Sequence, residues 1–362
     1  MKISFFKRVT TVYKIIGNNF SFWVSPIFTG LLLLLLRVVV FIGRFFDVIL
    51  FRYNKKIYKP IIIVGNPRSG TTFLQRFLVS NNLGSGTELW QMIYPSILLQ
   101  KFFKPILPLL EKISPAKHHS TDAHKTSLTS VETDDVGIFF RYLDGFFLYG
   151  FFLCWTEDDL FNWIDPKIRD NSNRDFQWLE SVWKRVLYVS KKDRLIAKLF
   201  SLSANLPVFL KKHNDAKILY LVREPIDVIP SGLSLVTGVL DKKFGFWKQP
   251  YHIRDRFIKR LYAGLVELLN RFCNDWNHGH IDKSKVYIVK YSRMMNDFEN
   301  LMSEIVEFVE CENSEELIKE IKLVSEKQST YKSKHKYNLE KFNLNKEKIR
   351  KDCAAVYKTF NI

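Results

Sequence analysis

The stretch IIIVGNPRSGTTFLQRFL, residues 61–78, decides the expected fold of this chain. It begins as an apolar run, continues as a loop between Gly65 and Gly70, and ends with apolar residues at helical spacing. A strand, a glycine loop and a helix in this order aim several backbone N–H groups and the helix dipole at one anion. The glycines let the backbone turn closely around that anion. The stretch therefore predicts a phosphate-binding loop in an α/β protein.

The loop departs from the phosphate loop of nucleoside triphosphatases at one position. There a lysine reaches the β- and γ-phosphates, whereas Thr71 takes its place here. No apolar strand elsewhere clearly ends in the aspartate that magnesium would need. Ser69 and Thr72 add hydroxyl donors, and Arg68 adds a positive charge. We therefore expect the loop to bind an anion other than a magnesium-bound triphosphate.

Four apolar runs bounded by turn residues have the pattern of buried parallel strands. The runs are residues 60–65, 194–200, 217–222 and 285–291. Helical periodicity dominates between them, as in residues 175–190 and 297–310. This alternation predicts an α/β fold, with a phosphate-loop-type parallel sheet flanked by helices. No repeat or linker divides the chain after the N-terminal segment, so we expect one domain over residues 55–362.

A second candidate anion site follows the run at residues 217–222. Arg223 comes directly after this strand, and Ser231 follows in a loop that enters a helix. Ligand contacts in α/β folds lie at the carboxyl ends of the strands. Together with the glycine loop, these two residues indicate a nucleotide with phosphate groups at two separate places. The alternative for Arg223 is a surface salt bridge with Glu224 or Asp227.

The segments VGNPRSGTTFL and YLVREPIDVIPSGLSL resemble the signature motifs of the sulfotransferase family, which uses 3′-phosphoadenosine 5′-phosphosulfate (PAPS) as its sulfonate donor. The resemblance covers residues 54–362 and is closer to bacterial and tyrosylprotein-type members than to soluble animal enzymes acting on steroids and phenols. It implies that the first motif holds the 5′-phosphosulfate and that Arg223 and Ser231 hold the 3′-phosphate. The donor contacts implied for the first motif are Arg68, Ser69, Gly70, Thr71 and Thr72.

The resemblance also implies candidates for catalysis. Sulfonate transfer needs a base for the acceptor's proton and cations for the charge that develops on the leaving phosphate oxygen. Glu88 stands where related members carry a catalytic glutamate, and Lys198 matches a lysine that touches the sulfonate or bridging oxygen. The proline that usually follows this lysine is absent here. Arg68 would share the cationic role. Glu88 is alternatively an N-terminal helix residue favoured by the helix dipole.

An acidic cluster offers a rival base. Glu132, Asp134 and Asp135 precede an aromatic stretch at residues 136–155. These acids could orient an acceptor hydroxyl, hold a metal or cap a helix that begins near Asp134. His119 is a further, minor candidate for the base. No histidine has convincing ligand spacing for zinc, so we expect no metal.

Two more donor contacts are expected from the C-terminal half of the chain. Lys334 lies in the segment SKHKYNLEKFNLNKEKI, residues 333–349, which resembles the closing loop and final helix of bacterial members. Tyr291 ends the last apolar run and is another expected contact. The alternative for Lys334 is that it belongs to a solvated basic run.

Residues 1–54 form a separate hydrophobic segment that we expect to associate with a membrane. Residues 15–36 contain no charged side chain, and this run is too long and too late for a cleavable signal peptide. It could lie in the membrane interface, span a bilayer over about residues 20–42, or be a buried helix. The basic residues that precede it favour a cytoplasmic N-terminus and suit anionic headgroups. They are Lys2, Lys7, Arg8 and Lys14.

If this segment is helical, four residues share one of its faces. They are Gly30, Arg37, Arg44 and Asp47. Such a narrow polar stripe on an apolar helix suits a helix that lies in a membrane interface.

The charge balance limits the classes of partner. The 362 residues include 55 Lys and Arg against 37 Asp and Glu, a net charge of +18 that attracts anions. No basic-aromatic nucleic-acid module occurs, so we expect no nucleic-acid partner. The four cysteines lie far apart without a CxxC pair, which suggests neither disulfides nor a zinc site.

These observations predict a metal-independent sulfotransferase at the cytoplasmic face of a membrane, either peripheral or with one span. It would move a sulfonate from PAPS to a hydroxyl of a lipid or saccharide, with Glu88 as the base. A protein tyrosine is a less favoured acceptor. Two alternatives remain: a phosphate-loop kinase or nucleotide hydrolase, and a non-catalytic nucleotide-binding protein on a membrane.

Overall fold

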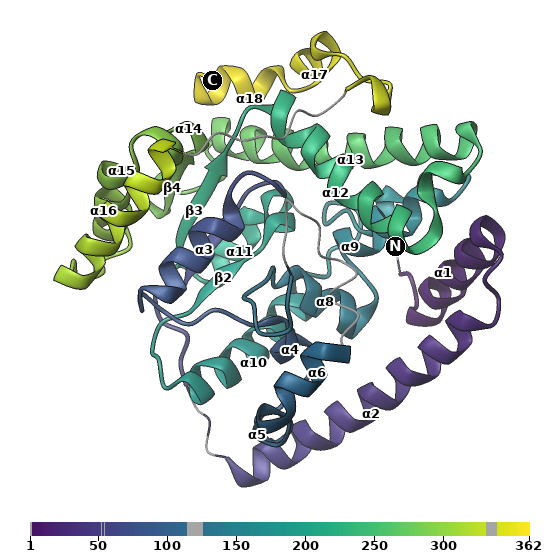
Figure 1. Ribbon diagram of the computed structural model, residues 1–362, viewed down its shortest axis with the longest axis horizontal. Helices are drawn as coiled ribbons and strands as arrows, with labels where there is room; N and C mark the ends of the chain where they lie inside the picture. The colour runs from purple at the N-terminus through teal and green to yellow at the C-terminus, as the bar shows by residue number, and fades with distance from the viewer. Residues whose placement is uncertain (1, 52, 54, 114–125, 331–338) are drawn as a thin grey trace. The chain divides into compact units, whose positions relative to one another are not determined.

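The computed structural model describes residues 2–51, 53, 55–113, 126–330 and 339–362 (Figure 1). Contacts along the chain group it into two interleaved units. The helical unit comprises Met1–Ile57, Thr87–Asp193 and Leu235–Gly264. The sheet unit comprises Tyr58–Gly86, Arg194–Ser234 and Leu265–Ile362. The predicted N-terminal segment, residues 1–54, falls within the helical unit.

The sheet unit contains a parallel sheet of four strands in the order β2-β1-β3-β4. The strands are β1 (Ile61–Val64), β2 (Ile196–Lys198), β3 (Lys217–Val222) and β4 (Val286–Lys290). Each lies inside one of the four predicted apolar runs, so the predicted sheet is confirmed. Every residue of β1 is buried, as expected for a central parallel strand.

Helices cover both faces of this sheet. The helices wholly within the sheet unit are α3 (Thr71–Ser80), α11 (Leu206–Lys212), α14 (Tyr291–Asn296), α15 (Phe298–Phe308), α16 (Glu315–Thr330), α17 (Lys346–Asp352) and α18 (Ala354–Phe360). Leu219 and Leu221 of β3 belong to one core cluster with side chains of α3 and α15. Tyr220 points to the other face, where it stacks on Phe272. Phe272 belongs to α13 (Tyr251–Asn277), a helix that, like α12 (Pro225–Phe244), has residues in both units. Alternate strand residues thus serve opposite layers.

The helical unit combines several short helices with three longer ones, α1 (Phe5–Phe20), α2 (Ser25–Leu50) and α10 (Ser172–Ser190). Its short helices include α4 (Leu89–Ile93), α5 (Ile97–Phe103), α6 (Leu107–Ile113), α8 (Asp135–Tyr142) and α9 (Phe146–Phe151). The aromatic stretch at residues 136–155 supplies part of the core, including the fully buried Tyr149 and Trp155. Figure 1 shows α2 as a long helix along the outside of this unit.

Three residues of the predicted polar stripe of α2, Arg37, Arg44 and Asp47, contact the protein, whereas Gly30 is exposed. The buried Asp47 carboxylate accepts hydrogen bonds from Ser96 Oγ at 3.0 Å and from the backbone N–H of Ile97 at 3.0 Å. Arg185 Nε pairs with the same carboxylate at 2.8 Å. Arg44 donates to the carbonyl oxygen of Pro95 at 3.2 Å. Polar contacts therefore attach α2 to the helical unit along one side.

The remaining surface of α2 is apolar and exposed. Among the described residues, α2 is the one helix long and apolar enough to cross a membrane, and only 11% of its most apolar window is buried. The exposed side chains include Phe28, Leu31, Leu32, Leu34, Leu35, Phe41, Phe45, Val48 and Ile49. The alternative of a buried helix is therefore wrong, because the buried residues described for α2 are limited to Val40, Gly43 and Asp47.

One of the basic residues expected to suit headgroups serves a structural role instead. Arg8 is buried, and its guanidinium donates to the carbonyl oxygens of Ile3 at 2.6 Å and of Tyr142 at 3.1 Å. Lys2 and Lys14 are exposed. Arg8 thus holds α1 against the helical unit.

Two glycines of α2 allow a matched test of how the helix is attached. A Cβ added at Gly43 would come within 2.8 Å of both Leu99 Cγ and Ser96 Oγ, whereas one added at Gly30 meets nothing within 4 Å. We expect Gly43→Ala to lower the free energy of unfolding by about 1–3 kcal/mol through overpacking. Gly30→Ala should be neutral or stabilise by up to about 1 kcal/mol. Denaturant unfolding followed by circular dichroism measures both, and equal effects would contradict the described packing of α2 on α5.

Candidate active site

The predicted phosphate loop joins β1 to α3 in the sheet unit. Gly65 and Gly70 have φ values of 143° and 96°, which side chains with a Cβ rarely adopt. A Cβ at Gly65 would lie 2.7 Å from the carbonyl oxygen of Leu221, and one at Gly70 would collide with Met294 Cε. Both positions therefore require glycine. Arg68, between them, has a φ of 79°, which is an unusual conformation for a non-glycine residue.

Hydrogen bonds within the sheet unit hold the loop in shape. The buried Ser69 donates from its hydroxyl to the carbonyl oxygen of Asn66 at 2.8 Å. Asn66 in turn donates through Nδ2 to the carbonyl oxygen of Leu265 at 2.9 Å. Ser69 is thus turned toward the loop itself, and its contact with an anion stays a prediction.

Asn66 is a loop residue that the sequence analysis missed. It lies two residues after the end of the buried strand β1, and it is itself buried. An amide at this point is the available sequence signal, because a polar side chain in a buried turn must find hydrogen-bond partners. Its partner Leu265 is 199 residues away, which local reasoning cannot supply.

Lys198 lies at the carboxyl end of β2, next to the start of α3. Its buried ammonium donates to Thr72 Oγ1 at 2.9 Å. Thr71 and Thr72 are the first two residues of α3, so a positive charge lies at the end of the helix that is itself partly positive. An anion that binds beside this ammonium is stabilised by its positive charge. The arrangement therefore fits an anionic ligand at the predicted loop.

Arg68 of the loop contacts both residues of the predicted second anion site, Ser231 and Arg223. Arg68 Nε donates to Ser231 Oγ at 3.0 Å, and Arg223 Nη1 donates to the carbonyl oxygen of Arg68 at 3.0 Å. The Arg223 guanidinium also stacks over the ring of Tyr291, 4.4 Å from its centroid. The structure thus brings together four predicted residues from three separate parts of the chain.

The surroundings of Arg223 fit a ligand with two anionic groups. Its Nε is buried and has no hydrogen-bond partner within the described part of the chain. The expected alternative, an ion pair with Asp227, is present at 3.6 Å, but Asp227 is exposed and such pairs contribute little. The donors therefore form two groups, one at the loop with Lys198 and one at Arg223 with Ser231.

Glu88 belongs to the helical unit and is the N-cap residue of α4. It forms a capping box with Gln91, whose side chain accepts from the Glu88 backbone N–H at 3.0 Å. Trp90 Nε1 donates to the Glu88 carboxylate. Burial raises the pKa of this carboxyl above its ordinary value, and the hydrogen bond from Trp90 opposes that rise. The helix-terminal alternative is thus confirmed, and a partly buried carboxylate with a raised pKa also suits a base.

The acidic cluster lies beside Glu88 in the same unit. Glu88 forms an isolated antiparallel bridge with Val131, next to Glu132. Asp134 occupies the N-cap position of α8, but its side chain makes no capping hydrogen bond; its carboxylate instead accepts from Trp183 Nε1 at 2.8 Å. Asp135 accepts from Thr133 Oγ1 at 2.5 Å. These bonds give Asp134 and Asp135 local structural roles.

Some expectations stay untested. Lys334 and His119 lie outside the described residues. Across the described ranges, no group of three or more His, Cys, Asp or Glu side chains is arranged to hold a metal.

Comparison with known proteins decides the family. The model of the sulfotransferase family matches residues 60–315, which include both motifs. The chain belongs to the sulfotransferase family. The resemblance seen in the motifs is thereby confirmed.

Curated relatives and solved structures agree with this assignment. Two omega-hydroxy-beta-dihydromenaquinone-9 sulfotransferases named Stf3, from Mycobacterium bovis and Mycobacterium tuberculosis, are each 24% identical over 256 residues. The match covers 66% of this chain and 59% of each relative's length. The structure of STF1 from Mycobacterium tuberculosis is 15% identical with a TM-score of 0.71, covering 97% of this chain and 91% of that one. STF9 from Mycobacterium avium is 15% identical with a TM-score of 0.66, covering 88% and 81%. These two structures show the fold.

Proposed function

We propose that this protein is a membrane-associated enzyme that transfers a sulfonate group from PAPS to a hydroxyl of a lipid, without a metal. The observation that carries the proposal is the pair of anion sites in the sheet unit. Arg68 joins them, because it lies in the loop and donates to Ser231. A donor with a 5′-phosphosulfate and a 3′-phosphate presents anions at two such places.

Each donor contact has a role that follows from its position. The loop N–H groups, Arg68 and Thr72 would hold the phosphosulfate at the start of α3. Lys198 would stabilise the negative charge that develops on the phosphate oxygen as its bond to sulfur breaks. Arg223 and Ser231 would hold the 3′-phosphate. Tyr291 supports Arg223 from its ring face.

Glu88 would take the proton of the acceptor hydroxyl as the new oxygen–sulfur bond forms. The support for this role comes from the surroundings of Glu88 within the helical unit. Burial raises the pKa of its carboxyl above the ordinary value, which brings the carboxyl closer to the pKa that suits a general base near neutral pH.

The surroundings of Glu88 favour a lipid-type acceptor. Its neighbours Leu89 and Trp90 form an apolar cluster with Leu128, against which Phe103 and Phe140 pack. The curated relatives are named for a hydroxylated menaquinone derivative, which is a prenyl lipid. The exposed apolar surface of α2 supports association with the membrane in which such an acceptor resides, on the cytoplasmic side. A saccharide acceptor has no comparable support.

The experiment that tests the proposal supplies a sulfonate donor and a phosphoryl donor in the same reaction. The protein is incubated with sulfur-labelled PAPS, labelled ATP and a lipid extract in the presence of EDTA. We expect sulfur label in the lipid fraction, and Arg223→Ala should raise the KM for PAPS by at least about 100-fold, as loss of a charged phosphate contact costs several kcal/mol. Consumption of ATP alone, and only with magnesium, would establish a kinase or hydrolase instead. Donor binding without transfer to any extract would favour the non-catalytic alternative.

A further inference from the structure

Three arginines around helix α2 have no carboxylate partner among the described residues. Arg37 donates to the carbonyl oxygen of Phe140 at 3.1 Å, and Arg44 donates to Ser181 Oγ at 2.9 Å. Arg141 contacts the protein through the rings of Trp178 and Tyr142, and its Nε is buried without a hydrogen bond. We call Arg37, Arg44 and Arg141 the arginine cluster. All three side chains are partly exposed, so a ligand can reach them.

The guanidinium groups of the cluster act on one another. Burial and the charge of Arg141 lower the pKa of Arg37. Burial and the charge of Arg185 lower the pKa of Arg44 to about 10. Arg185 is already paired with Asp47, so its charge is balanced. An anion that binds beside partly buried guanidinium groups with no carboxylate partner is stabilised by their positive charge. The planar guanidinium group also matches the geometry of two phosphate oxygens.

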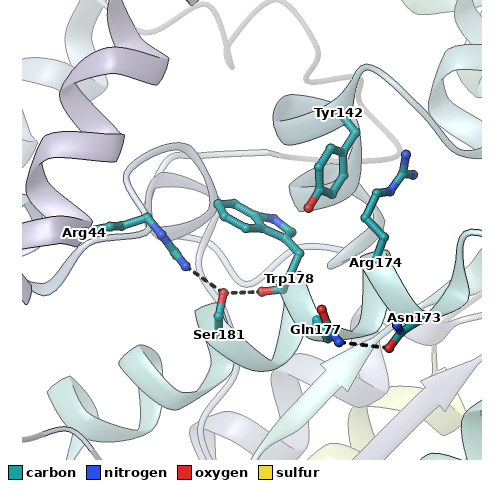
Figure 2. A pocket seen from close by; sticks show the side chains of 7 residues that line it. All are labelled: Arg44, Tyr142, Asn173, Arg174, Gln177, Trp178 and Ser181. Atoms are coloured by element: carbon teal, nitrogen blue, oxygen red, sulfur yellow. Dashed lines mark hydrogen bonds between the residues drawn. The ribbon is translucent and has the colours of Figure 1, made fainter. Parts of the chain in front are cut away.

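A shallow hollow adjoins the cluster and is open to a headgroup. Figure 2 shows Arg44 reaching from α2 toward Ser181, with the ring of Trp178 beside it and Arg174 on the far side. The hollow has a volume of about 400 Å³. Its lining residues are Arg44, Tyr142, Asn173, Arg174, Gln177, Trp178 and Ser181. Arg174 is paired with Asp144 and Asp175, and the Ser181 hydroxyl donates to the carbonyl oxygen of Trp178. Arg44 is therefore the guanidinium of this hollow that has no carboxylate partner among the described residues, and its fork suits a phosphodiester.

The exposed apolar surface of α2 continues from this cluster. Phe41 and Phe45 are exposed on the same helix, within one turn of Arg37 and Arg44. An apolar helix surface bordered by arginines matches a bilayer, whose acyl chains lie directly below its phosphate groups. A soluble acidic partner would match the charge but leave the apolar side chains in water.

We propose that the arginine cluster binds the phosphate groups of anionic phospholipids while α2 lies in the plane of the membrane. This inference rests on the proposed membrane association and is independent of the proposed chemistry. The attachment of α2 favours this orientation over a span. A spanning α2 would carry Asp47 and Arg44 away from their partners and break the buried Asp47–Arg185 pair, which is strongly destabilising.

Vesicle co-sedimentation of the full chain tests the proposal. The vesicles are pure phosphatidylcholine or a mixture of phosphatidylcholine with phosphatidylglycerol. We expect the wild type to bind the mixed vesicles more tightly than pure phosphatidylcholine. Relative to the wild type, Arg141→Gln should bind the mixed vesicles about fivefold more weakly, and the double variant Arg37→Gln/Arg141→Gln about 25-fold more weakly. Both variants should change binding to phosphatidylcholine much less, because the choline cation neutralises the phosphate of that lipid. Phe41→Ser should weaken binding to both vesicles. Lys259→Gln removes one exposed charge from the same unit and is the matched control.

The outcomes separate this inference from the function. Equal binding to both vesicles, or equal losses for Arg141→Gln and Lys259→Gln, would overturn the phospholipid site while leaving the membrane association standing. Binding to neither vesicle would overturn both, whatever the sulfonate-transfer assay shows. Inorganic phosphate alone could raise the unfolding temperature of the wild type but not that of Arg141→Gln. That result would identify a site for small anions instead of a phospholipid site. Thermal unfolding of every variant without ligand shows whether its fold is intact.

Discussion

Glu88→Gln is expected to lower the kcat for sulfonate transfer by about 10²–10⁴-fold, with little change in the KM for PAPS. The amide keeps the size of the side chain and still accepts the hydrogen bond from Trp90, but it cannot accept the acceptor's proton. The loss should therefore appear in turnover and spare donor binding. Initial rates with labelled PAPS and a saturating acceptor measure it.

The pH profile offers a second measurement of the same residue. Burial raises the pKa of Glu88 above its ordinary value of 4.5. As the pH falls through this raised pKa, the carboxylate takes up a proton and no longer acts as a base. The acidic limb of kcat should therefore lie above pH 4.5 in the wild type and be absent in Glu88→Gln.

Glu132→Gln provides the matched comparison. Glu132 is a buried acid close to Glu88 in the helical unit, and it accepts a hydrogen bond from Ser130 Oγ at 3.1 Å. We expect its replacement to leave most of the activity. A larger loss for Glu132→Gln than for Glu88→Gln would move the base to the acidic cluster.

Lys198→Ala is expected to lower kcat/KM by about 10²–10³-fold, because in the proposed mechanism this charge would stabilise the leaving phosphate in the transition state. Thr72 would keep its place at the start of α3, so donor binding should fall less than turnover. Single-turnover transfer of label, measured alongside equilibrium binding of PAPS, separates the two effects.

Lys217→Ala is the control for this variant. Lys217 begins β3 and pairs with Glu310 at 2.8 Å, at the amino end of the strand rather than its carboxyl end. Its replacement should leave kcat/KM near the wild-type value. Equal losses for the two lysines would indicate a general effect on the sheet and remove Lys198 from the proposed chemistry.

The fold follows closely from local sequence patterns. The apolar runs predict all four strands, and the glycine loop predicts where α3 begins, because a strand and a helix each depend on residues a few positions apart. The site is predictable only in part. The motifs identify Arg68, Arg223 and Ser231 but give no sign that Arg68 contacts Ser231, which is 163 residues away. Asn66 was missed for the same reason.

Helix α2 separates what the sequence determined from what the tertiary structure decided. The spacing of Arg37, Arg44 and Asp47 alone determined that an apolar helix would carry one polar stripe, because helical periodicity is a local property. Only the tertiary structure decided what that stripe meets. Asp47 finds Arg185 at a separation of 138 residues, so the stripe attaches the helix to the protein and leaves its apolar surface exposed. Periodicity determines which side chains share a face, whereas the partner of that face depends on contacts between distant segments of the chain.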